Sequence, residues 1–210
     1  MEIEVSKHIN LKFFRVVTMV VIIMGFTNLY LLRTEEIEKK VAIELITEEV
    51  EEEYLSVPYS NQIIKYSEMY DLDPYLVAAI IKTESSFNKD ISSHMGAIGL
   101  MQIMPSTGEW IAKNLGIDDF SQGMLQDADL NIQMGCWYLN YLEKQFKYKN
   151  EVLAAYNGGM GNVFNWLNDQ RYSADGEIIH TIPFKETLAY IEKVEVVYNE
   201  YIELYDKEEK

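Results

Sequence analysis

The stretch DPYLVAAIIKTESSF, residues 73–87, gives the clearest indication of the fold. Asp73 followed by Pro74 is typical of a helix N-terminus, because aspartate caps free backbone N–H groups and proline is tolerated at the first helical position. The apolar positions that we expect to face the core are Leu76, Val77, Ile80 and Ile81. The sequence therefore predicts a buried helix that carries Glu84 close to its C-terminal end.

Glu84 follows this apolar helix and precedes Ser85 and Phe87, which places it at the edge of a predicted core. A carboxyl group at such a place loses hydration, which raises its pKa and lets it donate a proton near neutral pH. The departing oxygen needs such a proton when a glycosidic bond is cleaved. The alternative is an exposed glutamate at a helix end, and taken alone Glu84 fits this alternative better.

A glycine-rich passage, GAIGLMQIMP at residues 96–105, comes next. Its glycines permit close approach of the backbone to a ligand. The amide of Gln102 suits the amide and hydroxyl groups of an amino sugar, and Met101 and Met104 offer adaptable apolar walls. On physical grounds alone, a tight turn with two core methionines is the commoner explanation of such a passage.

Helical periodicity continues through most of the chain from residue 58 onward, whereas strand-like alternation is nearly absent. We expect Pro105 to open one helix and Gly116 to close it, since glycine readily adopts the left-handed conformation that ends a helix. The other helices that we expect span residues 61–72, 127–146, 151–157, 161–167 and 184–205, with a polar loop at 173–176. In the helix at 127–146, the expected core positions are Ile132, Cys136, Leu139 and Leu142. The sequence thus predicts a mostly α domain.

An apolar segment near the N-terminus, residues 16–32, contains 17 residues without a charge. Phe13 and Phe14 extend it if Arg15 reaches the membrane interface, which predicts a transmembrane helix at 13–32. Basic residues precede the segment and glutamates follow it, so the positive-inside rule places residues 1–12 in the cytoplasm and the rest of the chain outside. The alternative is a cleaved signal peptide, although residues 30–33 form a poor cleavage site.

An acidic segment at residues 33–57, with EEVEEE at 48–53, separates the apolar segment from the helical domain. Ile37, Val41 and Leu45 recur at helical spacing, which is typical of an amphipathic stalk that holds a domain away from a membrane. A solvated linker is an equally good interpretation of the same composition.

The charge and the rarer residue types of the 210-residue chain exclude several classes of function. The formal net charge is −16, and such a surface repels phosphates, so we expect no nucleic acid partner. A single cysteine, Cys136, forms no intrachain disulfide. The three histidines are scattered, so we expect neither a metal site nor another cofactor.

Beyond these physical indications, the chain resembles the catalytic domain of the soluble lytic transglycosylases, which is similar in fold to goose-type lysozyme. The resemblance covers roughly residues 61–198 and rests on four blocks in a fixed order. The blocks are ES at 84–85 with SHMGAIGLMQIMP at 93–105, NIxxGxxYL at 131–139, AAYNGGxG at 154–161 and IPFxETxxYI at 182–191. Four ordered blocks are much more specific than any one of them. The resemblance implies a lysozyme-like helical domain that follows the transmembrane helix and the acidic stalk.

The resemblance also implies roles for individual residues. Glu84 stands where the family has its catalytic acid/base. The residues that match glycan-contacting positions, or adjoin them, are Ser93, Gly99, Gln102, Met104, Ala155, Tyr156, Asn157 and Tyr190. Core packing is the alternative for the two tyrosines, and we interpret Asn131 and Gly135 as structural. The chain departs from the family at Leu188, where an arginine is common, and at Gly108, where alanine is frequent.

The implied reaction is cleavage of peptidoglycan glycan strands between N-acetylmuramic acid and N-acetylglucosamine, with formation of a 1,6-anhydro ring. No aspartate stands at a family position for a second catalytic carboxylate, which favours this reaction over hydrolysis. A muramidase and an inactive glycan-binding membrane module are the alternatives. The expected organisation is a single-pass membrane protein with a catalytic domain at 58–205 outside the cell membrane and a charged tail at 206–210.

Overall fold

The computed structural model describes residues 33–34, 36–41 and 55–205, and the chain divides into two units, Met1–Glu53 and Tyr54–Lys210. In the first unit, residues 33–34 and 36–41 are helical. The predicted transmembrane helix at 13–32, the cytoplasmic segment 1–12, most of the acidic stalk and the tail at 206–210 lie outside the described residues. None of the helices in the described ranges is both long and apolar enough to cross a membrane.

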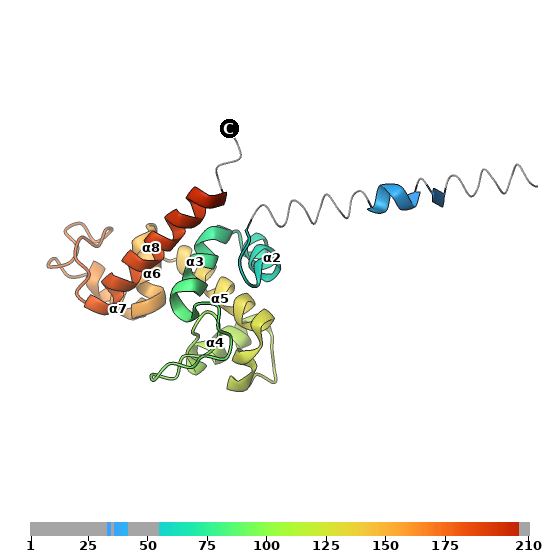
Figure 1. The fold of residues 1–210 in the computed structure, drawn as a ribbon. Helices are drawn as coiled ribbons and strands as arrows, with labels where there is room; N and C mark the ends of the chain where they lie inside the picture. The colour runs from blue at the N-terminus through green and yellow to red at the C-terminus, as the bar shows by residue number, and fades with distance from the viewer. Residues whose placement is uncertain (1–32, 35, 42–54, 206–210) are drawn as a thin grey trace, which may run out of the picture. The chain divides into compact units, whose positions relative to one another are not determined.

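The second unit is helical, as the sequence predicts, and has no named strand among residues 55–205. Two isolated bridges, Ser92 with Ile98 and Ile98 with Ile103, are the only β pairing in this range. The helices are α2 (Ser60–Tyr70), α3 (Pro74–Ser85), α4 (Pro105–Leu115), the 3-10 helix η1 (Gln122–Gln126), α5 (Ala128–Glu143), α6 (Lys149–Gly158), α7 (Met160–Leu167) and α8 (Lys185–Tyr205). Their arrangement is shown in Figure 1.

Helix α3 lies at the centre of the unit and packs mainly against α8 and α2 (Figure 1). The predicted cap is confirmed, because the Asp73 carboxylate accepts a hydrogen bond of 2.8 Å from the Tyr75 amide. A second bond to Asp73, 2.6 Å long, comes from the Tyr198 hydroxyl and ties the start of α3 to α8. The apolar residues of α3 are buried, including all four that we expected. The helix is thereby fixed at both its start and its flank.

Helix α5 agrees with the sequence in its core positions and differs at its C-terminal end. Ile132, Cys136, Leu139 and Leu142 are fully buried, as expected. The helix ends at Glu143, whereas the apolar pattern predicted its extension to Phe146. Phe146 is still buried, because the chain folds back after the helix and packs the ring 4.9 Å from that of Phe164. The apolar periodicity of residues 127–146 therefore predicts the buried residues correctly, but its prediction of where the helix ends is wrong.

The other helix ends follow from local backbone chemistry. Pro105 opens α4 and Gly116 ends it in the left-handed conformation, with φ of 73°, as predicted. Helix α2 stops at Tyr70, two residues before the predicted end. The cause is Asp71, which adopts φ of 56° and returns its N–H to carbonyls of the last turn. The 3-10 helix η1 has no counterpart in the sequence prediction.

Candidate active site

Glu84 lies in the last turn of α3, one residue before the helix ends. Ser86 and Phe87 both have positive φ, so the chain turns away at this point and leaves Glu84 at the rim of the core. The side chain is partly buried. Burial raises the pKa of its carboxyl from 4.5 to about 7, against a smaller opposite effect of the Tyr190 hydroxyl. A carboxyl group with this pKa is partly protonated at neutral pH and is suited to donate a proton.

Two tyrosines from other helices surround Glu84. Tyr190 of α8 is 6% exposed, and its hydroxyl interacts with the Glu84 carboxyl while making no well-aligned hydrogen bond with any described residue. Tyr156 of α6 donates a 2.8 Å hydrogen bond to the Met101 carbonyl. Burial, and next the neighbouring Glu84 charge, hold the pKa of both phenols well above the usual value. The structure thus brings together three of the predicted site residues from three helices.

The glycine-rich passage after α3 is held against α5 by one buried side chain, Asn131. Its amide nitrogen donates to the carbonyls of Ile98 and Leu125 at 3.0 and 2.8 Å. Its amide oxygen accepts from the Met101 N–H at 2.8 Å. Asn131 is fully buried, its bonds to Met101 and Leu125 are buried and its bond to Ile98 is partly buried, so together they fix the passage in one position.

Two glycines allow this close packing. A Cβ atom on Gly99 would lie 2.4 Å from both the Asn131 amide nitrogen and the Leu125 carbonyl oxygen, and φ of 81° also disfavours a side chain there. A Cβ atom on Gly135 of α5 would lie 2.1 Å from the Met101 sulfur. The structural interpretation of Asn131 and Gly135 is therefore confirmed. Gly99 contributes to the candidate site through its backbone only.

Two of the predicted glycan-contacting side chains also stabilise the passage internally. The Gln102 amide nitrogen donates to the Gly99 carbonyl at 2.8 Å and to the Ile91 carbonyl at 3.3 Å. The Ser93 hydroxyl accepts from the Ala97 N–H at 3.0 Å. Met104 differs from both, since it precedes α4 and is 38% exposed. A direct contact with glycan stays a prediction for all three side chains.

The remaining predicted contacts come from the end of α6. Ala155 is fully buried and Asn157 is exposed, although the Asn157 amide oxygen accepts a 2.9 Å bond from the Thr187 hydroxyl of α8. Thr187 has no predicted role, yet it lies in the ETxxYI block and fixes Asn157. Tyr138 is a second omission: its ring packs 5.7 Å from that of Tyr156. Thr187 and Tyr138 both lie inside blocks that carry the family resemblance. Their place in these blocks was the only feature of the sequence that could have indicated a role at the site.

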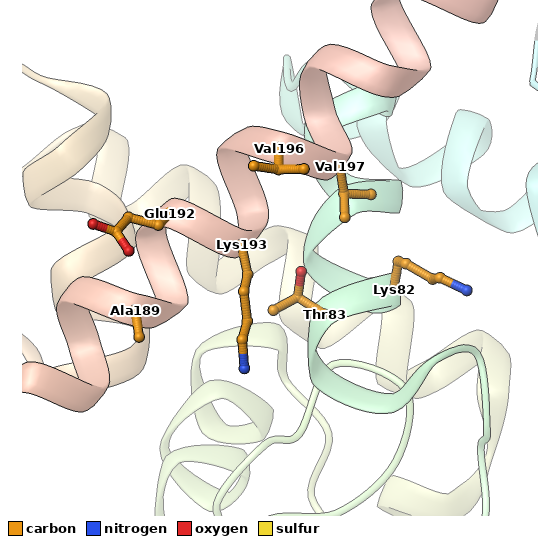
Figure 2. A pocket seen from close by; sticks show the side chains of 7 residues that line it. All are labelled: Lys82, Thr83, Ala189, Glu192, Lys193, Val196 and Val197. Atoms are coloured by element: carbon orange, nitrogen blue, oxygen red, sulfur yellow. The ribbon is translucent and has the colours of Figure 1, made fainter.

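A groove of about 470 Å³ lies between α3 and α8 and does not include Glu84 (Figure 2). Thr83 lines it, and neighbouring residues of a helix point about 100° apart, so Thr83 and Glu84 serve different surfaces. The ammonium groups of Lys82 and Lys193 turn in different directions and do not converge on one point (Figure 2). The groove is also lined by Ala189, Glu192, Val196 and Val197. The groove is therefore distinct from the carboxyl group and the tyrosines of the candidate active site.

The similarity to known proteins covers this same part of the chain. Residues 61–179 match the family described as the transglycosylase SLT domain. The soluble lytic murein transglycosylase of Salmonella typhimurium is 35% identical over 154 residues, which are 71% of this chain and 24% of that protein. The membrane-bound lytic murein transglycosylase C of Sodalis glossinidius is 34% identical over 135 residues, 60% of this chain and 38% of that protein.

A solved structure is similar over nearly the same region. An inactive mutant of the lytic transglycosylase Slt from Pseudomonas aeruginosa matches with a TM-score of 0.62 at 34% identity. The match covers 70% of this chain and 24% of that one. The match to this chain thus spans about a quarter of the soluble relatives.

Proposed function

This chain belongs to the transglycosylase SLT domain family, and on that basis we propose that it is a lytic transglycosylase acting on peptidoglycan. The bond cleaved is the β-1,4 bond between N-acetylmuramic acid and N-acetylglucosamine. The observation that carries the proposal is the Glu84 carboxyl at the family's acid position, with its pKa raised to about 7 beside two tyrosines.

In the proposed reaction Glu84 acts twice. Its protonated carboxyl first donates to the oxygen that links the two sugars, so the C1–O bond breaks and positive charge develops at C1 of the muramic acid, assisted by the N-acetyl group. The ionised Glu84 then takes the proton from the C6 hydroxyl of the same sugar. The C6 oxygen attacks C1 and closes the 1,6-anhydro ring, and Glu84 returns to its protonated state.

The eight proposed substrate contacts divide by exposure. Met104 and Asn157 are exposed and are proposed to touch the sugars with their side chains. Gly99 and Ala155 are buried, so they are proposed to contribute backbone and shape. The other four proposed contacts are polar residues that are buried or partly buried, and they are proposed to bind the sugars from the side nearer the core. They are Ser93, Gln102, Tyr156 and Tyr190.

Hydrolysis by a muramidase is the nearest alternative. A hydrolase of this type needs a second carboxylate to activate water or to form a covalent intermediate. No aspartate of the chain stands at a family position for that second carboxylate, which favours a nucleophile supplied by the substrate. An inactive glycan-binding module is the other alternative, and the raised pKa of Glu84 favours an acid catalyst over it.

We further propose that residues 13–32 anchor the protein in the cell membrane, with the catalytic domain at 58–205 outside. The uncharged residues 16–32, the basic residues that precede them and the glutamates that follow support this orientation. The cytoplasmic segment would be 1–12, the stalk 33–57 and the tail 206–210. One relative carries the name of a membrane-bound lytic transglycosylase, and the proposed substrate lies outside the membrane.

The proposal is tested by the release of soluble fragments from purified peptidoglycan sacculi by the full chain and by its Glu84→Gln variant. We expect the variant to lose at least about a hundredfold in rate, because general acid catalysis contributes at least this much. Glu143→Gln is the matched control, since burial also raises the pKa of Glu143 but at the far end of α5. Equal rates for the parent and the Glu84 variant would refute the assignment.

A further inference from the structure

A second hollow, of about 450 Å³, lies beside α4. Its polar lining residues are Ser106, Glu109, Lys113 and Asp118, and its apolar ones are Trp110, Ile117 and Phe120. The site therefore combines an aromatic surface with two carboxylates, one ammonium group and one hydroxyl. Four of the seven lining residues are polar, which suits a ligand rich in hydrogen-bonding groups, and the aromatic rings offer it an apolar surface.

Trp110 packs among three aromatic rings although it is 39% exposed. Its ring meets those of Trp137, Tyr138 and Tyr141 edge-to-face, with centroids 5.2, 6.1 and 5.0 Å away. The Trp137 and Tyr141 rings are in turn stacked on each other at 5.7 Å. An exposed indole fixed by three aromatic neighbours offers a flat apolar surface with little loss of conformational freedom on binding.

The departure from the family at Gly108 shapes the same hollow. Gly108 is buried in α4, and a Cβ atom there would lie 2.9 Å from the end of the Phe120 ring. An alanine would therefore displace Phe120, which forms part of the lining. The glycine allows the ring to pack directly on α4, so the residue at this position shapes the lining of the hollow.

Two observations link the hollow to elements that also carry the candidate active site. Met104, a proposed glycan contact, immediately precedes α4, and Ser106 in its first turn lines the hollow. Tyr138 packs against both Trp110 and Tyr156, whose phenol is influenced by Glu84. Met104 and Lys113 are nine positions apart, which is roughly 14 Å along the helix axis. A polymeric ligand at the candidate active site thus needs to extend about this far to reach the hollow.

We propose that this hollow is an accessory site for amino-sugar rings of the same glycan strand, and this rests on the proposed function. The indole of Trp110 packs against the apolar face of a pyranose ring. Glu109 and Asp118 accept hydrogen bonds from hydroxyl and N-acetyl N–H groups, while Lys113 donates to ring substituents. A strand bound both here and at Glu84 dissociates more slowly than one bound at Glu84 alone.

The test compares binding and cleavage in the full chain. Binding is measured by co-sedimentation with purified sacculi in the Glu84→Gln background, so that the polymer stays intact. Trp110→Ala is expected to weaken binding about tenfold, equivalent to about 1.4 kcal/mol, and Glu109→Ala is expected to weaken it in the same direction. Phe164→Ala is the matched control, since Phe164 is also an aromatic residue with 39% exposure but lies on α7.

Cleavage by the parent with Glu84 intact gives the second measurement. Trp110→Ala is expected to lower the rate on sacculi several times more than the rate on a short soluble peptidoglycan fragment. Equal losses on both substrates, unchanged sacculus binding, or the same loss in Phe164→Ala would overturn the proposal. If the protein cleaves neither substrate while Trp110 still governs sacculus binding, the accessory site stands and the proposed catalytic function fails. Loss of binding to a protein partner with sacculus binding retained would assign the hollow to that partner instead.

Discussion

The environment of Glu84 makes the pH dependence of activity a direct test at the scale of a single residue. The pKa of Glu84 is raised to about 7, and in the proposed reaction this carboxyl must be protonated before the first step. We therefore expect kcat/KM to fall about tenfold for each pH unit above this value. The profile is measured on soluble peptidoglycan fragments, and a rate that stays constant up to about pH 9 would contradict the acid role.

Tyr190 affects the pH at which activity is expected to fall. Its hydroxyl lowers the pKa of Glu84 against the larger effect of burial. Tyr190→Phe removes that influence, so the fall in activity should begin at a higher pH than in the parent. Tyr201→Phe, on the same helix near its C-terminal end, is the control and should leave the profile in place.

The raised pKa of Glu84 also has a consequence for stability. Between pH 4.5 and about 7 the folded state keeps a proton that the unfolded chain loses, so the free energy of unfolding falls as pH rises through this range. Glu84→Gln removes the effect and should stabilise the protein above pH 7, by at most about 3 kcal/mol, with no gain near pH 4. Denaturant unfolding at the two pH values measures the difference. An equal effect at both would mean that proton linkage is not the cause.

At the scale of elements, α5 determines the position of the glycine-rich passage through Asn131. Asn131→Ala breaks three hydrogen bonds, two of them buried, and leaves their backbone partners without it, which should cost about 2–4 kcal/mol of stability. Activity should fall at temperatures where the variant is still folded, because Gln102 and Met104 lose their fixed positions.

Asn140→Ala is the matched control on the same helix. Asn140 donates one bond, to the Tyr70 carbonyl at 2.7 Å, so its loss should cost about 1 kcal/mol and leave activity unchanged. Thermal unfolding and cleavage rates measure both variants. A larger loss of activity in the Asn140 variant would contradict this role of Asn131.

The sequence predicted the helices well because apolar periodicity and capping residues act locally. Asp73 and Gly116 mark helix ends through bonds within a few residues, and Pro105 through its fixed φ and its missing N–H. The structure agrees with all three. The end of α5 was wrong because Phe146 is apolar for a tertiary reason, its packing against Phe164. A periodic pattern reports which residues are buried and contains no information on whether the last of them are helical.

The candidate site could be predicted only through the family resemblance. Taken alone, Glu84 fitted an exposed helix end better, since its burial depends on Tyr156 and Tyr190, which are distant in sequence. The internal bonds of Ser93 and Gln102 were not foreseen for the same reason. The hollow beside α4 was missed because Gly108 and Phe120 meet only in the folded chain.

For the whole molecule, the proposed anchor predicts where the protein is found after cell lysis. The full chain should sediment with membranes and be released by detergent but not by high salt, because an uncharged helix is held by the hydrophobic effect. Removal of residues 1–32 should transfer it to the soluble fraction with its activity on sacculi retained. If the full chain is expressed and the recovered protein is soluble without detergent and lacks its N-terminal residues, the signal peptide is favoured instead.

Lytic cleavage of peptidoglycan by Glu84 as acid/base leaves a distinctive chemical product. We would analyse by mass spectrometry the sacculi digested by the full chain and by its Glu84→Gln variant. We expect fragments ending in 1,6-anhydro-N-acetylmuramic acid from the parent and none from the variant. Fragments with reducing-end muramic acid, or anhydro products in equal amount from the variant, would contradict lytic cleavage by Glu84.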